Sequence, residues 1–233
     1  MKIAIMQPYF LPYIGYFQLI NVVDKFVIYD NVQFVRKGWI NRNRILVNGK
    51  DEFVTIPLKK DSDYLDIDKR QLTDTFNADG EKILRRIKES YRKAPYFEQV
   101  FAFVEDLIKY NPDNLFSFVF NAVMKVCVYL EINTELVVSS SIDADHSLKS
   151  EQRVLSIVTK MNAQTYVNAI GGQELYSIES FKNSKVELKF IQSDLIPYKQ
   201  FNNEFVPWLS ILDVMMFNSK DEIKKMLQAF TIK

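Results

Sequence analysis

The sequence predicts an α/β fold: a three-layer, Rossmann-like and mostly parallel sheet with a helical insertion. Five short apolar segments of β character alternate with segments of helical periodicity along the chain. The first two of these β segments enclose a single helix, which is the order of a parallel strand pair with a right-handed crossover. The 233 residues, of which 48% are hydrophobic, suffice for one packed domain.

The N-terminal βαβ unit is the first element of this prediction. Residues 2–6 form an apolar strand, residues 14–23 have one apolar helical face, and residues 26–29 form a second apolar strand. Open α/β sheets bind ligands at the carboxyl ends of their strands. These ends are predicted at residues 7–9 and 30–31.

The middle of the chain predicts a β-hairpin and then helices. Residues 44–57 contain two apolar runs around Asn48-Gly49, a dipeptide typical of a type I′ hairpin turn. Helical periodicity follows in three segments, 80–92, 96–109 and 114–130. We expect residues 79–131 to form a helical insertion or subdomain within a single domain that spans 1–233.

The βα alternation then resumes. Strands are predicted at 135–139, 165–168 and 186–191, and helices at 150–161, 173–181 and 220–230. Gly171 and Gly172 are expected to open the second of these helices.

Composition excludes several classes of protein. The 30 basic and 29 acidic residues leave a net charge of +1, which disfavours extended nucleic-acid binding. The lone Cys127 rules out a disulfide framework and a Cys-rich metal site, and no metal site is predicted. No apolar stretch approaches the roughly 18 residues that would span a bilayer. We therefore expect a soluble, cytoplasmic protein.

Two strand-end loops hold polar and aromatic residues suited to a ligand. In the first loop, two prolines fix the backbone and Gly15 permits close approach, and the flanking side chains either bind ligand or pack over the sheet edge. The second loop interleaves arginines, which grip diphosphate, with amides and a tryptophan. The substrate-binding candidates in these loops are Gln7, Tyr9, Tyr13, Tyr16, Gln33, Trp39, Asn41, Arg42, Asn43 and Arg44.

His146, the only histidine, and Asp30 are the candidate catalytic residues, because either could accept a proton near neutral pH. The alternatives for His146 are a helix-capping role and a metal site with Asp143 and Asp145. Lys149 and Arg153 follow as candidates for binding phosphate.

A strand, two glycines and a helix are typical of a phosphate-binding turn, which makes Asn168, Gly171 and Gly172 candidates. The segment 198–213 is expected to form a lid or a wall. Within it Asp213, if buried, needs a partner, for example a basic residue of the second loop. We expect Tyr9, Trp39, Arg42 and Gly172 to converge on one cavity.

Several of these segments together resemble the WbqC-like family. The matching residues are 6–17, 38–43, 56–58, 171–176 and 207–213, so the resemblance extends over nearly the whole chain. It implies a bacterial protein of O-antigen or other surface-glycan gene clusters that works on nucleotide-linked, often amino, sugars. The implied activities include attachment of an acyl or aminoacyl group such as glycine.

The leading hypothesis is a transferase that modifies a dTDP-linked amino sugar by N-acyl or aminoacyl transfer during lipopolysaccharide biosynthesis. No cofactor is firmly implied beyond an acyl or aminoacyl donor, and a homo-oligomer is possible. The first loop is also similar to that of HIGH-class nucleotidylyltransferases, with Tyr16 in place of a histidine. A nucleotidylyltransferase or ATP-dependent ligase is therefore one alternative, and a non-catalytic binding or scaffold protein is another.

Overall fold

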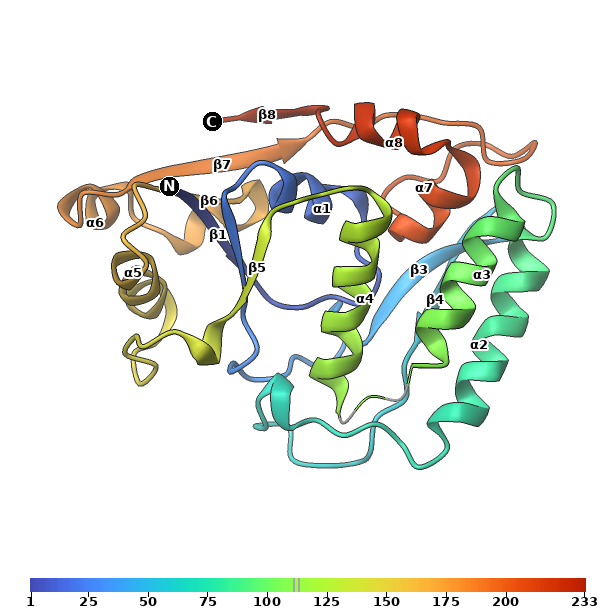
Figure 1. The fold of residues 1–233 in the computed structure, drawn as a ribbon, viewed down its shortest axis with the longest axis horizontal. Helices are drawn as coiled ribbons and strands as arrows, with labels where there is room; N and C mark the ends of the chain where they lie inside the picture. The colour runs from blue at the N-terminus through green and yellow to red at the C-terminus, as the bar shows by residue number, and fades with distance from the viewer. Residues whose placement is uncertain (111, 113) are drawn as a thin grey trace.

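A sheet of six strands in the order β5-β2-β1-β6-β7-β8 lies at the centre of the computed structural model, which describes residues 1–110, 112 and 114–233 (Figure 1). The first five strands in that order run parallel, and β8 pairs antiparallel with β7. The predicted mostly parallel, Rossmann-like sheet is therefore confirmed. The strands are β1 (Lys2–Met6), β2 (Lys25–Ile28), β5 (Glu135–Val138), β6 (Thr165–Ala169), β7 (Glu187–Ser193) and β8 (Phe230–Ile232).

The strand order reverses at β1. The chain proceeds outward from β1 to β2 and β5, then crosses back through helix α5 (Ser150–Lys160) to β6 on the other side of β1. The connections after β1 and β6 therefore leave in opposite directions. In open α/β sheets the crevice at such a reversal is where ligands bind.

Helices cover both faces of the sheet, because side chains alternate between the faces along each strand. Ala4 of β1 belongs to one hydrophobic core, whereas its neighbours Ile3 and Ile5 belong to a second, smaller one. The larger core includes α1 (Ile14–Asn21), α7 (Ile211–Phe217) and α8 (Lys220–Met226). The smaller core includes α5 and α6 (Ile178–Asn183), which lie together at the left of Figure 1.

The connection between β2 and β5 holds a hairpin and three helices. The hairpin pairs β3 (Arg42–Val47) with β4 (Lys50–Thr55), and both turn residues have positive φ, 49° at Asn48 and 78° at Gly49. These angles fit the predicted type I′ turn. The three helices are α2 (Phe76–Tyr91), α3 (Phe97–Ile108) and α4 (Leu115–Tyr129).

Buried side chains of these three helices belong to the same core as α1. The predicted insertion therefore shares the larger core with the central sheet. In Figure 1, α2 and α3 run side by side at the right. The boundaries 79–131 for an insertion within one domain stay a prediction.

Two predicted helices are corrected. Gly171 and Gly172 lie in a short 3-10 helix, Ile170–Leu175, and the α-helix starts only at Ile178. Its start is set by Ser177, whose hydroxyl accepts a hydrogen bond from the Ser180 amide at 3.3 Å. The C-terminal helix is shorter than predicted, because residues 230–232 pair with β7 as strand β8.

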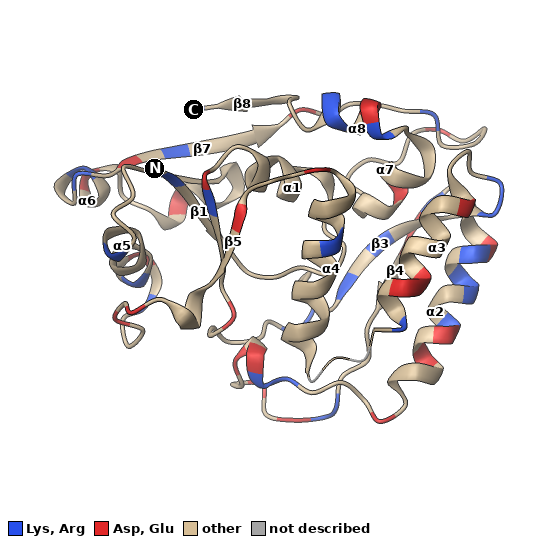
Figure 2. Cartoon of the chain, viewed as in Figure 1, with Lys and Arg blue, Asp and Glu red and all other residues tan. Residues whose placement is uncertain are grey.

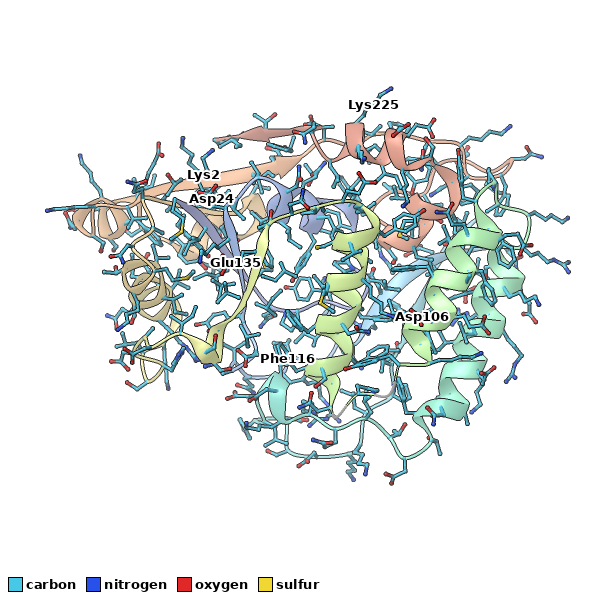
Figure 3. The ribbon with its side chains drawn as sticks, in the orientation of Figure 1. Lys2, Asp24, Asp106, Phe116, Glu135 and Lys225 are labelled. Atoms are coloured by element: carbon cyan, nitrogen blue, oxygen red, sulfur yellow. The ribbon has the colours of Figure 1, made fainter. Side chains whose placement is uncertain are left out.

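Charged residues of both signs are mixed over the surface, as on α2 in Figure 2. Several at the amino ends of the strands serve the fold (Figure 3). Asp24 accepts a hydrogen bond from the Lys2 amide at 2.6 Å, and Lys25 pairs with Glu135 at 2.9 Å. Within the described part of the chain, no helix combines the length and the apolar character that crossing a membrane requires.

Candidate functional site

An aromatic cavity of about 400 Å³ opens at the carboxyl ends of β1, β6 and β7. It therefore lies at the reversal of strand order between β1 and β6, where the fold class favours a ligand. Nine residues line the aromatic cavity: Tyr9, Pro12, Tyr13, Trp39, Asn43, Ile170, Gln192, Ser193 and Trp208.

The loop after β1 forms one wall and is held in place by several hydrogen bonds. The Phe10 amide lies 3.1 Å from the carbonyls of both Trp39 and Ile40. The Asn43 side-chain amide donates to the carbonyls of Phe10 and Leu11, at 3.1 and 3.0 Å. Leu11 has a φ of 42°, a conformation that L-residues rarely adopt without such support. The loop backbone is thus fixed before any ligand arrives.

Trp208, whose φ is 58°, forms another part of the cavity wall. Its ring meets that of Tyr13 edge-on, with the centroids 5.9 Å apart. Arg44 holds this part of the wall. Its guanidinium donates a hydrogen bond to the Trp208 carbonyl at 3.2 Å and pairs with Asp51 at 3.0 Å. The same guanidinium lies 5.6 Å from the centre of the Trp39 ring. Arg44 therefore braces two tryptophans and does not line the cavity itself.

Gly15 sets the position of the Tyr13 ring. A Cβ atom at Gly15 would lie 2.4 Å from that ring and 2.3 Å from the Ser193 hydroxyl oxygen. Only a residue without a side chain leaves room for Tyr13 to fold over the start of α1 and reach the cavity.

The cavity offers aromatic surfaces and neutral hydrogen-bonding groups. Burial raises the pKa of the Tyr9 hydroxyl, and the neighbouring Tyr13 raises it further. Burial also raises the pKa of Tyr13, an effect that a hydrogen bond with Ser193 partly offsets. Both hydroxyls therefore stay protonated at neutral pH and can donate hydrogen bonds. Among the described residues that line the cavity there is no carboxylate, lysine, arginine or histidine.

A second, polar cavity of about 550 Å³ brings the loop after β2 together with the start of α5. Gln33, Lys149 and Arg153 are among its lining residues. His146 is not among these lining residues, but it contacts two of them, Asn31 and Arg153. Its Nε2 donates to the Ile142 carbonyl at 2.9 Å, which leaves Nδ1 to accept from Asn31 at 3.2 Å.

The Arg153 guanidinium is also 3.3 Å from that Nδ1, so both ring nitrogens of His146 have partners. The other catalytic candidate, Asp30, is buried and accepts a hydrogen bond from the Ser140 amide at 2.9 Å. Neither residue lines the aromatic cavity. Their catalytic roles stay predictions.

The expectation of a single shared cavity is corrected. Tyr9, Tyr13, Trp39 and Asn43 meet in the aromatic cavity, as expected for two adjacent strand-end loops. Asn41 and Arg42 instead line a third, basic cavity. The cause is local: Arg42 turns back to donate to the carbonyls of Lys37 and Gly38, away from Trp39's cavity.

The other binding candidates lie outside these three cavities. Tyr16 is buried and donates to the Gln7 carbonyl at 3.0 Å. The Asn168 side-chain oxygen accepts from the Ala169 amide at 2.7 Å. Gly171 has open space where a Cβ would stand, so no packing requirement explains a glycine there.

Sequence reasoning missed some residues and misjudged a partner. Gln192 and Ser193 were missed, although they end a parallel strand and the strand-end rule applies to them too. Trp208 lies in the segment that was expected to form a wall. The partner of Asp213 is not a cation: three neutral groups, from Tyr91, Tyr198 and Gln200, donate to its carboxylate at 2.7–2.8 Å.

Comparison with known proteins gives one family. The profile of the WbqC-like protein family matches residues 7–225, which include every residue of the aromatic cavity. The chain is also similar to a Mycobacterium tuberculosis protein named "Uncharacterized protein Rv1507c", at 27% identity over 220 residues that make up 93% of each chain. No solved structure matches the chain.

Proposed function

The chain belongs to the WbqC-like protein family, and from that premise we propose that it is a transferase acting on a nucleotide-linked amino sugar in the cytoplasm. The reaction proposed is transfer of an acyl or aminoacyl group, such as glycyl, to the sugar amine during surface-glycan synthesis. The observation that carries the proposal is the aromatic cavity at the reversal of strand order, with four aromatic side chains on its walls.

The walls suit a ring-shaped ligand. The faces of Trp39 and Trp208 can stack on a pyranose or a base, and such contacts contribute about 1 kcal/mol each beyond the area they bury. The protonated hydroxyls of Tyr9 and Tyr13, with the Gln192 side chain, can hydrogen-bond sugar hydroxyls. A preformed wall also lowers the entropic cost of binding.

The proposed reaction balances without an oxidant or a metal. The lone pair of the neutral sugar amine attacks the acyl carbon, a C–N bond forms, and the bond between that carbon and the donor's leaving group breaks. The nitrogen then loses one proton. Because no base is among the described residues of the aromatic cavity, we assign that proton to the leaving group or to water. The cavity contributes orientation.

The test combines binding with product detection. Purified protein is titrated with a dTDP-linked 4-amino sugar, then incubated with acyl and aminoacyl donors while the sugar nucleotide is followed by mass spectrometry. We expect saturable binding and a mass gain of one acyl group. Trp39→Ala should weaken binding about tenfold, as the loss of one stacked ring predicts.

Tyr64→Ala is the matched control, because Tyr64 is 84% exposed and lines none of the three cavities. Binding with no mass gain from any donor would favour a second candidate function, a non-catalytic carrier of the sugar nucleotide. The absence of a carboxylate, lysine, arginine or histidine among the cavity's described residues supports that candidate. If neither binding nor product appears, the proposal is wrong.

The ATP-dependent alternative gains little support from the first loop. Tyr16, which stands where the similar HIGH-class loops have a histidine, is buried and its hydroxyl is engaged by the Gln7 carbonyl. It is therefore not available to stabilise charge on a phosphate.

A further inference from the structure

The basic cavity, about 400 Å³ in volume, carries a concentration of positive charge that the proposed reaction site does not use. Figure 2 shows the arginines of β3 in blue, and Arg42 of this strand contributes to the wall of the basic cavity. No carboxylate is among its described lining residues. The lining residues are Phe34, Arg36, Lys37, Asn41, Arg42, Thr55, Leu58, Lys59, Lys60 and Arg70.

Arg70 is the most unusual of these residues because it is only 5% exposed. Its guanidinium donates to the carbonyls of Ser62 and Lys59, at 3.0 and 3.2 Å, and lies 5.1 Å from the centre of the Phe34 ring. Its Nε has no hydrogen-bond partner among the described residues. These neighbours are neutral, and no residue that the structure describes forms an ion pair with Arg70. A buried charge without a counterion is costly, and an anion in the cavity would offset that cost.

The other cations add to the excess of charge. Arg36 pairs with Asp63 and Lys59 with Asp74, but these pairs are exposed and therefore weak. Lys37 and Lys60 form no ion pair with any residue that the structure describes. Several cations around a concave surface attract anions and raise their local concentration.

The basic cavity is separate from the aromatic cavity. Their described lining residues do not overlap, although both draw on the chain segment 36–43. Arg42 closes the turn inside this segment through its hydrogen bonds to the carbonyls of Lys37 and Gly38. Trp39 faces one cavity, while Lys37 and Arg42 face the other.

We propose that the basic cavity is a second ligand site, which binds the phosphate groups of a small polyanion other than the ligand of the aromatic cavity. Lysines and arginines bind phosphate through charge-assisted hydrogen bonds, and Phe34 and Leu58 supply an apolar part of the lining. The observations above carry the site itself. The identity of its ligand rests on the proposed function: if that function is correct, the ligand is an acyl donor whose leaving group carries phosphate.

The test measures pyrophosphate binding by calorimetry, first without any sugar nucleotide. The double variant Lys37→Ala/Lys60→Ala removes two cations that have no ion pair, so it should leave folding intact. We expect it to weaken pyrophosphate binding at least tenfold, and we expect the wild-type affinity to fall as salt rises. The control is Lys50→Ala/Lys199→Ala, which removes the same charge from exposed lysines outside the three cavities and should change nothing.

No pyrophosphate binding, or equal effects of the two double variants, would overturn the proposal. Tighter binding of a single-stranded oligonucleotide than of pyrophosphate would overturn it in favour of a nucleic-acid site. The dTDP-linked sugar supplies the last arm: where it binds, saturating pyrophosphate should leave its Kd unchanged, and displacement would show one continuous site. If the sugar nucleotide does not bind at all, the proposed function fails while the pyrophosphate titration still decides this site.

Discussion

Asp213 is a buried carboxylate, and the described residues that donate hydrogen bonds to it are all neutral. Its carboxylate accepts from the hydroxyls of Tyr91 and Tyr198 and from the Gln200 amide, while the Tyr91 oxygen accepts from the Leu46 amide at 2.7 Å. Burial raises the pKa of Asp213, and the three hydrogen bonds only partly offset that effect. One side chain thus connects α7 with α2, β3 and the segment before α7.

The pH dependence of stability tests this view of Asp213. Because the pKa of Asp213 is higher in the folded than in the unfolded protein, the folded state binds the proton more tightly. Its contribution to the free energy of unfolding therefore rises as pH falls through the folded pKa, and levels off below the unfolded value near 3.8. Urea unfolding of wild type and Asp213→Asn, from about pH 7 to about pH 4, isolates this contribution as a difference.

We expect Asp213→Asn to be less stable by about 1–3 kcal/mol, because an amide nitrogen cannot accept the Tyr91 or Tyr198 hydroxyl proton. The deficit relative to wild type should widen toward the acidic end. A deficit that narrows there would mean that the folded pKa is lowered, which would contradict the argument.

At the scale of elements, the entry into α1 controls the cavity wall. Tyr13 directly precedes this helix, and the ring lies where a side chain on Gly15 would have to stand. The helix, the first loop and the end of β7 can therefore pack this closely only because residue 15 has no Cβ atom.

Gly15→Ala tests that fit. The new methyl group would overlap the Tyr13 ring and the Ser193 hydroxyl, so we expect a loss of stability of about 1–3 kcal/mol and weaker ligand binding in the aromatic cavity. Thermal unfolding and the sugar-nucleotide titration measure the two effects. Gly171→Ala is the control, because its methyl group would meet open space and should leave stability unchanged. Equal stability of the two variants would contradict the steric account.

Elements that depend on local pattern were predictable from the sequence, and elements that depend on distant partners were not. The βαβ unit and the Asn48-Gly49 turn follow from periodicity and turn chemistry. Strand β8 has only three residues and exists because β7 lies beside it. The helix after Gly172 was placed too early because the Ser177 cap was not recognised.

The same distinction holds for the candidate site. The strand-end rule brought Tyr9 together with Trp39, because it follows from topology alone. It could not separate Arg42 from Trp39, since that depends on the direction in which one side chain turns. The contact of Asp213 with Tyr91 was also out of reach, because Tyr91 lies 122 residues away in the chain.

At the scale of the whole molecule, three cavities of different chemistry lie near the carboxyl ends of the strands and beside the inserted hairpin. The aromatic cavity follows β1, β6 and β7, the polar cavity joins the loop after β2 to α5, and the basic cavity lies beside the hairpin. This division supports an account in which a ring-bearing ligand and a second, phosphate-bearing ligand are bound in different places.

The most direct measurement is a crystal structure of the protein soaked with a dTDP-linked 4-amino sugar. The account predicts a sugar or base ring in the aromatic cavity, in contact with Tyr9, Trp39 and Trp208. Density for the ligand in the polar or the basic cavity, with the aromatic cavity empty at a saturating concentration, would contradict it.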